Sequence, residues 1–168
     1  MDEQTLTALL RQVRDGGMQI PEAVDRLRRL EVEVLASARL DHHRALRTGL
    51  PEAVFGENKS ADQLVEILAA LLRTDSVVLA TRVDADKAAA VRARLAGLAY
   101  HPAARILTGN DRHIPVGRAS GTVVIVTAGT SDLPVAEEAR ITLHMFGHPV
   151  ETVYDAGVAG IHRILAHS

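Results

Sequence analysis

An unbroken apolar run at residues 123–126 constrains the fold more than any other feature of this 168-residue chain. The run reads Val-Val-Ile-Val and predicts a parallel strand covered on both faces, because a half-exposed strand would alternate apolar and polar side chains. A polar loop over 127–132, a helical pattern and a second strand over 150–154 follow it. This order is typical of the opening of a doubly wound parallel sheet.

The helix between these two strands is expected to start at a Ser131 or Asp132 cap. Its spacing predicts an apolar face of Val135, Ala139, Leu143 and Phe146. Two parallel strands do not form a stable sheet alone, so the three-layer sheet domain over 122–168 is expected to be incomplete. Either another chain completes the sheet or the natural protein continues beyond Ser168, and we expect the second.

The first 37 residues predict a pair of amphipathic helices. The first helix presents Leu6, Leu9, Leu10 and Val13, and Gly16-Gly17 ends it. Pro21 suits the first turn of the second helix, whose predicted apolar face is Val24, Leu27 and Leu30. The pair has too little apolar surface to stand alone, so it is expected to pack on a neighbouring segment or on a partner chain in a homo-oligomer.

Residues 38–108 predict a small α/β domain. Ser60 and Gln63 have the spacing of a capping box ahead of an apolar helical face, and residues 77–81 predict a buried strand. Asp84 is expected to cap a second helix, which Gly97 ends. One further extended piece is expected over 100–107, with Pro102 at an edge or bulge. The turn-rich residues 109–121 are predicted to be a linker.

The composition excludes several classes of function. The chain has no cysteine, which removes disulfides, thiolate zinc sites, iron–sulfur clusters and a cysteine nucleophile. A net charge of −2 and four aromatic residues argue against nucleic-acid binding. The chain contains no apolar run long enough to span a membrane, and its N-terminal residues do not resemble a secretory signal, so a cytoplasmic protein is expected.

Two loops at the ends of the predicted parallel strands are the candidate binding elements. The first contains Gly129, Thr130, Ser131 and Asp132, and the second contains Asp155, Gly157, Gly160, His162 and Arg163. Backbone N–H groups at a helix start attract phosphate or carboxylate, and an Arg can bind the same groups through two hydrogen bonds. An ordinary capped turn and a solvated histidine remain the alternatives.

A polar cluster at residues 39–47 is a third candidate. If this segment is extended, His42 and His43 point in opposite directions, which argues against a metal site. The arginines of the cluster favour anion recognition, and a solvated edge with a weak Asp–Arg pair is the alternative.

Five motifs in order resemble one family from residue 38 onward: LDHHRALRTGLPEAVFGENKS, VLATRV, YHPAARIL, VTAGTSDLPVAEEA and YDAGVAGIHRIL. The chain is similar to the nickel-pincer-nucleotide carboxylase/hydrolase family of the LarB type. The C-terminal domain of that family is related to aminoimidazole ribonucleotide carboxylase. The resemblance implies a substrate, nicotinic acid adenine dinucleotide, whose pyridinium ring is carboxylated and whose phosphoanhydride is hydrolysed, releasing AMP. It also implies carbon dioxide or bicarbonate as co-substrate, no tightly bound cofactor, and Mg²⁺ as an optional addition.

The resemblance further implies which residues bind the dinucleotide. They are the members of the two loops, with an assisting role for His162, together with Asp41, His42, Arg44 and Arg47. The family's covalent nucleophile is a cysteine beyond position 168, so the 168-residue chain is expected not to carboxylate. The alternatives are a non-catalytic nucleotide-binding or assembly subunit and, more weakly, a purine-pathway carboxylase acting on aminoimidazole ribonucleotide.

Overall fold

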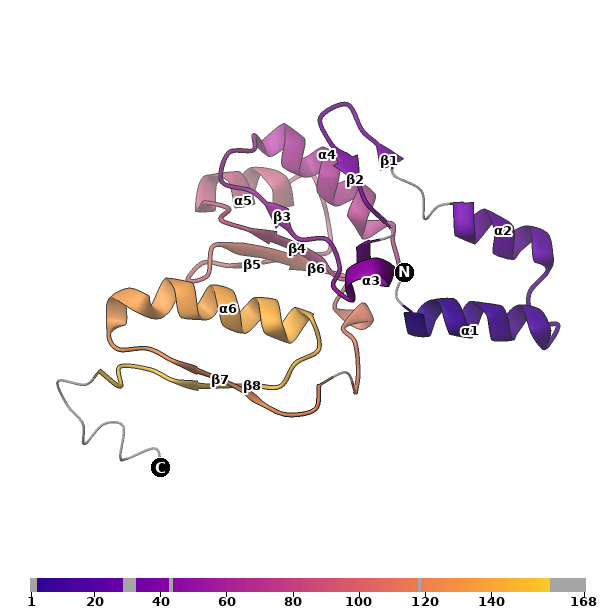
Figure 1. Cartoon of the computed structure of the whole chain (residues 1–168). Helices are drawn as coiled ribbons and strands as arrows, with labels where there is room; N and C mark the ends of the chain where they lie inside the picture. The colour runs from indigo at the N-terminus through magenta and orange to yellow at the C-terminus, as the bar shows by residue number, and fades with distance from the viewer. Residues whose placement is uncertain (1–2, 29–32, 43, 118, 158–168) are drawn as a thin grey trace.

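The computed structural model describes residues 3–28, 33–42, 44–117 and 119–157, and it has the α/β architecture expected from the sequence. The strands form three sheets, which are drawn with the helices in Figure 1. The strands are β1 (Glu33–Val34), β2 (Arg39–Leu40), β3 (Val54–Phe55), β4 (Val78–Thr81), β5 (Leu98–His101), β6 (Ile106–Gly109), β7 (Val123–Val126) and β8 (Val150–Val153). The helices are α1 (Glu3–Arg14), α2 (Ile20–Arg28), α3 (Arg44–Thr48), α4 (Ala61–Leu72), α5 (Ala85–Arg92) and α6 (Leu133–Met145).

The central sheet has four strands in the order β3-β4-β6-β5. Strand β3 runs parallel to β4, and the other two pairs are antiparallel. The single extended piece expected over 100–107 is wrong: β5 and β6 form a hairpin, and Pro102 lies in the turn between them. A proline has no N–H for a ladder, so it ends the strand rather than interrupting it.

Both faces of the central sheet are covered. Val78 and Ala80 of β4 pack with α4 and α5, whereas Leu79 packs with α6 on the other face. This alternation follows from the two-residue period of a strand. The predicted caps are confirmed, because Ser60 forms a capping box with Gln63, and Asp84 accepts a hydrogen bond from the amide of Lys87.

The C-terminal part contains the predicted strand–helix–strand unit, with β7 parallel to β8. Helix α6 lies between this pair and the central sheet (Figure 1), and Ile141 and Met145 of the helix, with Phe146 directly after it, belong to a shared core. The predicted face was wrong at Val135, which is 63% exposed, because packing on the central sheet turns a different side of α6 inward.

Strand β7 is covered on one face alone among the described residues. Its side chains alternate between half-buried and exposed, and those of Val124 and Val126 are 52% and 61% exposed. The described residues therefore supply cover for one face of β7, and the predicted cover of its second face stays a prediction. The expected α/β class with an incomplete sheet domain is confirmed.

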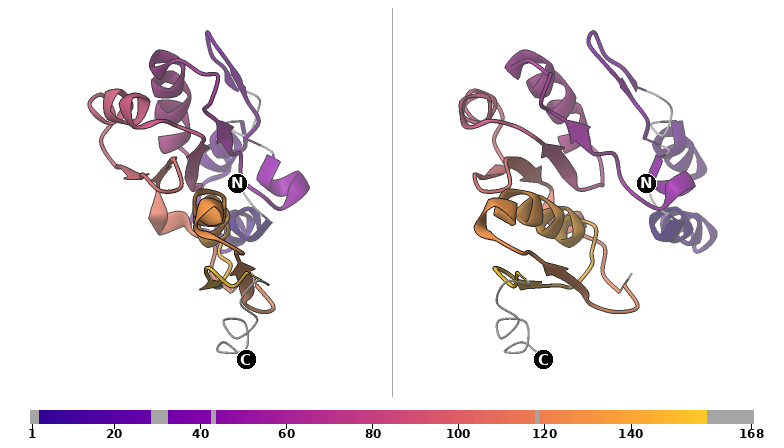
Figure 2. Two further views of the ribbon diagram at one scale, coloured as in Figure 1. Left: turned by 90° about the vertical axis from the view of Figure 1, so that its left-hand side faces the viewer. Right: turned by 60° about the vertical axis from the view of Figure 1, so that its left-hand side comes forward.

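Helices α1 and α2 form the predicted pair, to one side of the sheets (Figures 1 and 2). Their small core contains Leu9, Met18 and Ala23. Leu10 and Val24, predicted to face inward, are exposed instead, because the pair buries a narrower stripe than a complete helical face. Packing of the pair on a partner chain stays a prediction.

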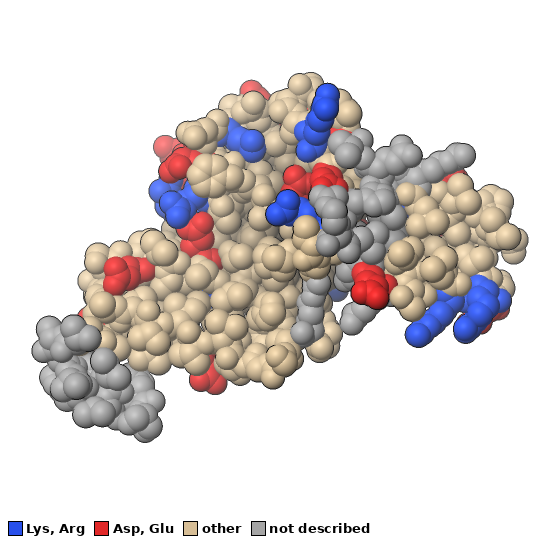
Figure 3. Space-filling view, viewed as in Figure 1, with Lys and Arg blue, Asp and Glu red and all other residues tan. Residues whose placement is uncertain are grey.

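Charged side chains of both signs are interspersed on the face drawn in Figure 3. An extended area of one sign is not visible there. Among the described residues, the helices are all too short or too polar to cross a membrane.

Candidate functional site

The carboxyl ends of β7 and β8 bring residues 127–132 and 154–157 together, and we call these two segments the loop pair. Thr127 is buried and joins them: its Oγ1 accepts a hydrogen bond from the amide of Asp155 at 3.2 Å. The amide of Ala156 donates to the carbonyl of Thr127 at 2.8 Å. The first residues of both predicted loops are therefore neighbours, as expected for adjacent parallel strands.

Gly157 lies against the first loop. A Cβ atom built on Gly157 would be 2.6 Å from the carbonyl oxygen of Ala128, closer than side chains approach backbone. A glycine is therefore required for this spacing between the segments.

The first loop closes on itself. Asp132 Oδ2 accepts a hydrogen bond from the amide of Gly129 at 3.1 Å, and the amide of Asp132 donates to the carbonyl of Gly129 at 3.2 Å. Asp132 is the N-cap residue of α6, as predicted, but its side chain makes no hydrogen bond to the helix, because a 3₁₀ turn over Thr130–Asp132 precedes the helix and the carboxylate accepts a hydrogen bond from Gly129. Thr130 and Ser131 are exposed at this turn. The predicted second-loop residues Gly160, His162 and Arg163 lie outside the described residues.

A hydrogen-bonded group of three side chains joins α6 to the start of the second loop. The Tyr154 hydroxyl donates a hydrogen bond to Glu137 Oε1, and Arg140 binds the same carboxylate through Nε and Nη2, the latter at 2.8 Å from Oε2. The pKa of Glu137 lies below its ordinary value of 4.5, mainly because Arg140 hydrogen-bonds to the charged form and secondarily because Tyr154 does. Burial and the bond to Glu137 raise the pKa of the Tyr154 phenol.

The charged Glu137 carboxylate is expected to contribute to the free energy of unfolding, and this contribution should be lost in acid. The folded-state pKa of Glu137 is depressed, so its contribution is present above the ordinary pKa of 4.5 and is lost as pH falls through the lower folded-state value. We expect Glu137→Gln to have a lower free energy of unfolding than the parent chain at pH 7. This difference between variant and parent should disappear in acid. Urea denaturation at a series of pH values measures the difference. Glu151→Gln, at an exposed position of β8, is the matched control; equal pH dependence of the two variants would contradict the assignment.

The polar cluster at residues 39–47 is extended only at Arg39–Leu40. Strand β2 ends at Leu40 and helix α3 begins at Arg44, so the predicted alternation of side chains along a strand is wrong. The backbone turns at Asp41, whose carbonyl accepts a hydrogen bond from the amide of Arg44 and whose amide donates to Glu52 Oε2 at 3.0 Å. A short turn with paired backbone groups therefore replaces the strand.

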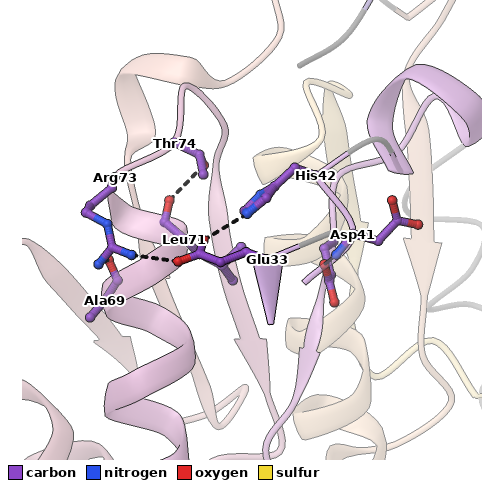
Figure 4. A network of polar contacts seen from close by, with 8 residues as sticks. Glu33, Asp41, His42, Ala69, Leu71, Arg73 and Thr74 are labelled. Atoms are coloured by element: carbon purple, nitrogen blue, oxygen red, sulfur yellow. Dashed lines mark hydrogen bonds and ion pairs between the residues drawn. The ribbon is translucent and has the colours of Figure 1, made fainter. Parts of the chain in front are cut away.

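His42, which lies in this turn, contacts the carboxylate of Glu33 in β1. Its Nε2 lies 3.0 Å from Glu33 Oε2, and the other oxygen of Glu33 accepts a hydrogen bond from Arg73 at 3.0 Å (Figure 4). The contact joins the β1–β2 hairpin to the end of α4. Arg44 is exposed, whereas His43 and the side chain of Arg47 lie outside the described residues. The described part of the chain contains no group of three potential metal ligands, counted over His, Cys, Asp and Glu.

The structure does not bring the two candidate regions together. Leu40, next to Asp41, belongs to the core on the α4 face of the central sheet. The loop pair follows strands that lie beyond α6, on the other side (Figure 1). Sequence reasoning missed Thr127 and the Glu137–Arg140–Tyr154 cluster. A polar residue directly after the apolar strand was the available signal for Thr127.

Comparison with known proteins gives two matches. Residues 32–111 match the family model described as the LarB/PurE-like N-terminal domain. The chain is also 32% identical over 167 residues to an uncharacterized protein of Methanocaldococcus jannaschii, an alignment that covers 96% of the chain. The chain spans 65% of the length of that relative. Residues 32–111, which include β1 to β6 with α3 to α5, are therefore similar to the LarB/PurE-like N-terminal domain.

Proposed function

We propose that this protein acts on nicotinic acid adenine dinucleotide in the synthesis of a nickel-pincer cofactor. The LarB/PurE-like domain indicates a carboxylase-related function in general. The resemblance stated above adds the specific reaction: carboxylation of the pyridinium ring with carbon dioxide or bicarbonate, and hydrolysis of the phosphoanhydride with release of AMP. The protein is proposed to work as a homo-oligomer.

The observation that carries the proposal is the loop pair. Parallel strands direct their carboxyl ends to one edge, where ligands bind in open α/β sheets. Here that edge presents exposed Thr130 and Ser131 hydroxyls beside Gly129 and Gly157, whose small size permits close backbone approach. Hydroxyl and backbone N–H groups suit the phosphates of a dinucleotide.

The carboxylation step needs a group that these 168 residues do not contain. In the family, a cysteine thiolate adds to the pyridinium ring and makes a neighbouring carbon nucleophilic towards carbon dioxide. The chain has no cysteine. We therefore propose that this polypeptide binds the dinucleotide without carboxylating it, and that the wider activity belongs to a longer natural protein.

Calorimetric titration with nicotinic acid adenine dinucleotide, and incubation with labelled bicarbonate, test the proposal. We expect saturable binding and no labelled product from the 168-residue chain. Release of AMP would support the enzyme over a binding-only subunit. Absence of binding up to about 10 mM ligand would overturn the proposed substrate. Labelled product from the purified chain would overturn the assignment of ring chemistry to a cysteine.

A further inference from the structure

A histidine lies at the margin of the contact between α6 and the central sheet. In the apolar part of this contact, Ile141 and Met145 pack with Leu79 of β4 and Ile106 of β6. His101, the last residue of β5, pairs with Ile106 in the antiparallel register, so both side chains are on the face of the sheet that α6 covers. Because β5 is an edge strand, His101 stands where the apolar contact ends.

The ring of His101 lies against a buried hydroxyl group. Its Nε2 is 2.9 Å from Oγ1 of Thr108, a residue of β6 that is 2% exposed. The threonine hydroxyl can donate a hydrogen bond to a neutral ring nitrogen, whereas a protonated ring can only donate. Protonation of His101 therefore places a positive charge beside a buried polar atom and restricts the hydrogen bond between the two groups.

Four charged or titratable side chains face the His101 ring. Arg140, His144 and Glu137 are on α6, and Asp111 is in the turn after β6. The Glu137 carboxylate already accepts hydrogen bonds from Nε and Nη2 of Arg140, at 3.0 and 2.8 Å. A protonated His101 ring would repel the Arg140 guanidinium and compete with it for this carboxylate.

The folded chain therefore favours the neutral form of His101. Burial is the main cause that lowers the pKa of His101 below its ordinary value of 6.5, Arg140 lowers it further and His144 adds to this, whereas Asp111 and Glu137 act in the opposite direction. The unfolded chain binds this proton more readily. The contribution of the neutral ring to stability is thus complete above pH 6.5 and is lost progressively as the pH falls towards the lower folded-state pKa.

We propose that His101 is a pH sensor between the central sheet and α6: the neutral ring closes this contact, and the protonated ring loosens it in mild acid. Histidine is the side chain whose charge ordinarily changes in this range of pH. Helix α6 also carries Glu137, which accepts a hydrogen bond from Tyr154 at the start of the second loop, so the sensor links pH to the support of the loop pair. The proposal concerns the packing of the chain and does not depend on the proposed substrate.

Hydrogen exchange of the whole chain, followed by NMR at about pH 7.5 and about pH 5.5, tests the proposal. Protection factors are compared, because they correct for the direct effect of pH on amide exchange. They are expected to fall at least about threefold in acid at residues 141–145 of α6. Residues 67–71 of α4 pack on the opposite face of the sheet and should keep their protection. An equal fall in both helices would overturn the proposal, because acid would then act on the whole fold.

Two histidine variants separate His101 from the other titrating groups. His101→Gln keeps a side chain that can form a hydrogen bond to Thr108 but stays uncharged, so its α6 protection should be the same at both pH values. His148→Gln removes a histidine that follows α6 and should lose protection in acid as the parent chain does. A loss in His101→Gln as large as that of the parent would contradict the assignment.

The ring of His101 can also be titrated directly in the parent chain, which tests the proposal even where His101→Gln does not fold. The midpoint of its NMR shift is expected below 6.5 and should coincide with the midpoint at which α6 loses protection. A midpoint at or above 6.5 would overturn the proposal. So would a loss of α6 protection that begins only below pH 4.5, the ordinary pKa of Glu137, because a carboxylate would then be the sensor.

Discussion

Replacement of Leu68 by alanine is expected to lower the free energy of unfolding by about 3 kcal/mol. Leu68 is fully buried on α4, where it packs against the strands of the central sheet, including Val78 and Leu107. Removing its terminal carbons loses their transfer free energy and leaves a cavity that a sheet and a helix cannot close completely. Urea denaturation followed by far-ultraviolet circular dichroism measures the change.

Two further variants separate this effect from a general loss of helix stability. Leu10→Ala makes the same chemical change on α1, at a side chain that is 54% exposed, and should cost less than about 0.5 kcal/mol. Leu68→Met conserves volume and should cost less than about 1.5 kcal/mol. Similar losses for Leu68→Ala and Leu10→Ala would show that the core is not organised around α4 as described.

Several features that depend on a few neighbouring residues were predicted correctly from the sequence. The cap at Ser60 requires only a hydroxyl and a glutamine three residues later. The strand at 123–126 and its parallel partner follow from an apolar run and from the helix between them. In such cases local chemistry and the final fold favour the same structure.

Features that depend on contacts between distant segments were not predictable in this way. The central sheet, which is distant in sequence, determines which face of α6 is buried, because Ile141 and Met145 pack against it. The segment from Arg39 to Arg44 reads equally well as a strand, but the pairing of His42 with Glu33 accompanies a turn. Helical spacing and polar composition do not specify a packing partner.

The candidate site likewise has parts that could be predicted from the sequence and parts that could not. Adjacent parallel strands must present their carboxyl ends together, so the meeting of residues 127–132 with 155–157 could be expected. The buried hydroxyl of Thr127 that joins them, and the carboxylate of Glu137 beneath Tyr154, depend on three-dimensional placement. The supporting residues of a site are therefore harder to predict than the loops that they hold.

Gly157→Ala is expected to weaken binding of nicotinic acid adenine dinucleotide at the loop pair by more than about tenfold. The new Cβ atom would lie 2.6 Å from the carbonyl oxygen of Ala128, a backbone atom that a side-chain rotation cannot move away. The second segment must shift from the first, and binding groups displaced by even a fraction of an ångström lose their hydrogen-bond geometry. Calorimetric titration of the folded variant measures the loss.

Two other glycines show whether this loss comes from the contact or from any added methyl group. Gly121→Ala, just before β7, meets no atom within 4 Å and should bind the dinucleotide as the parent chain does. Gly129→Ala also meets none and has an extended backbone at φ −148°, so its stability should be unchanged. If Gly129→Ala lowers the affinity but leaves the stability unchanged, the added methyl group interferes with the bound ligand and not with the fold. The space of that methyl group would then be the place of a ligand phosphate. Parent-like binding by Gly157→Ala would contradict the proposal that the spacing of the two segments forms the dinucleotide site.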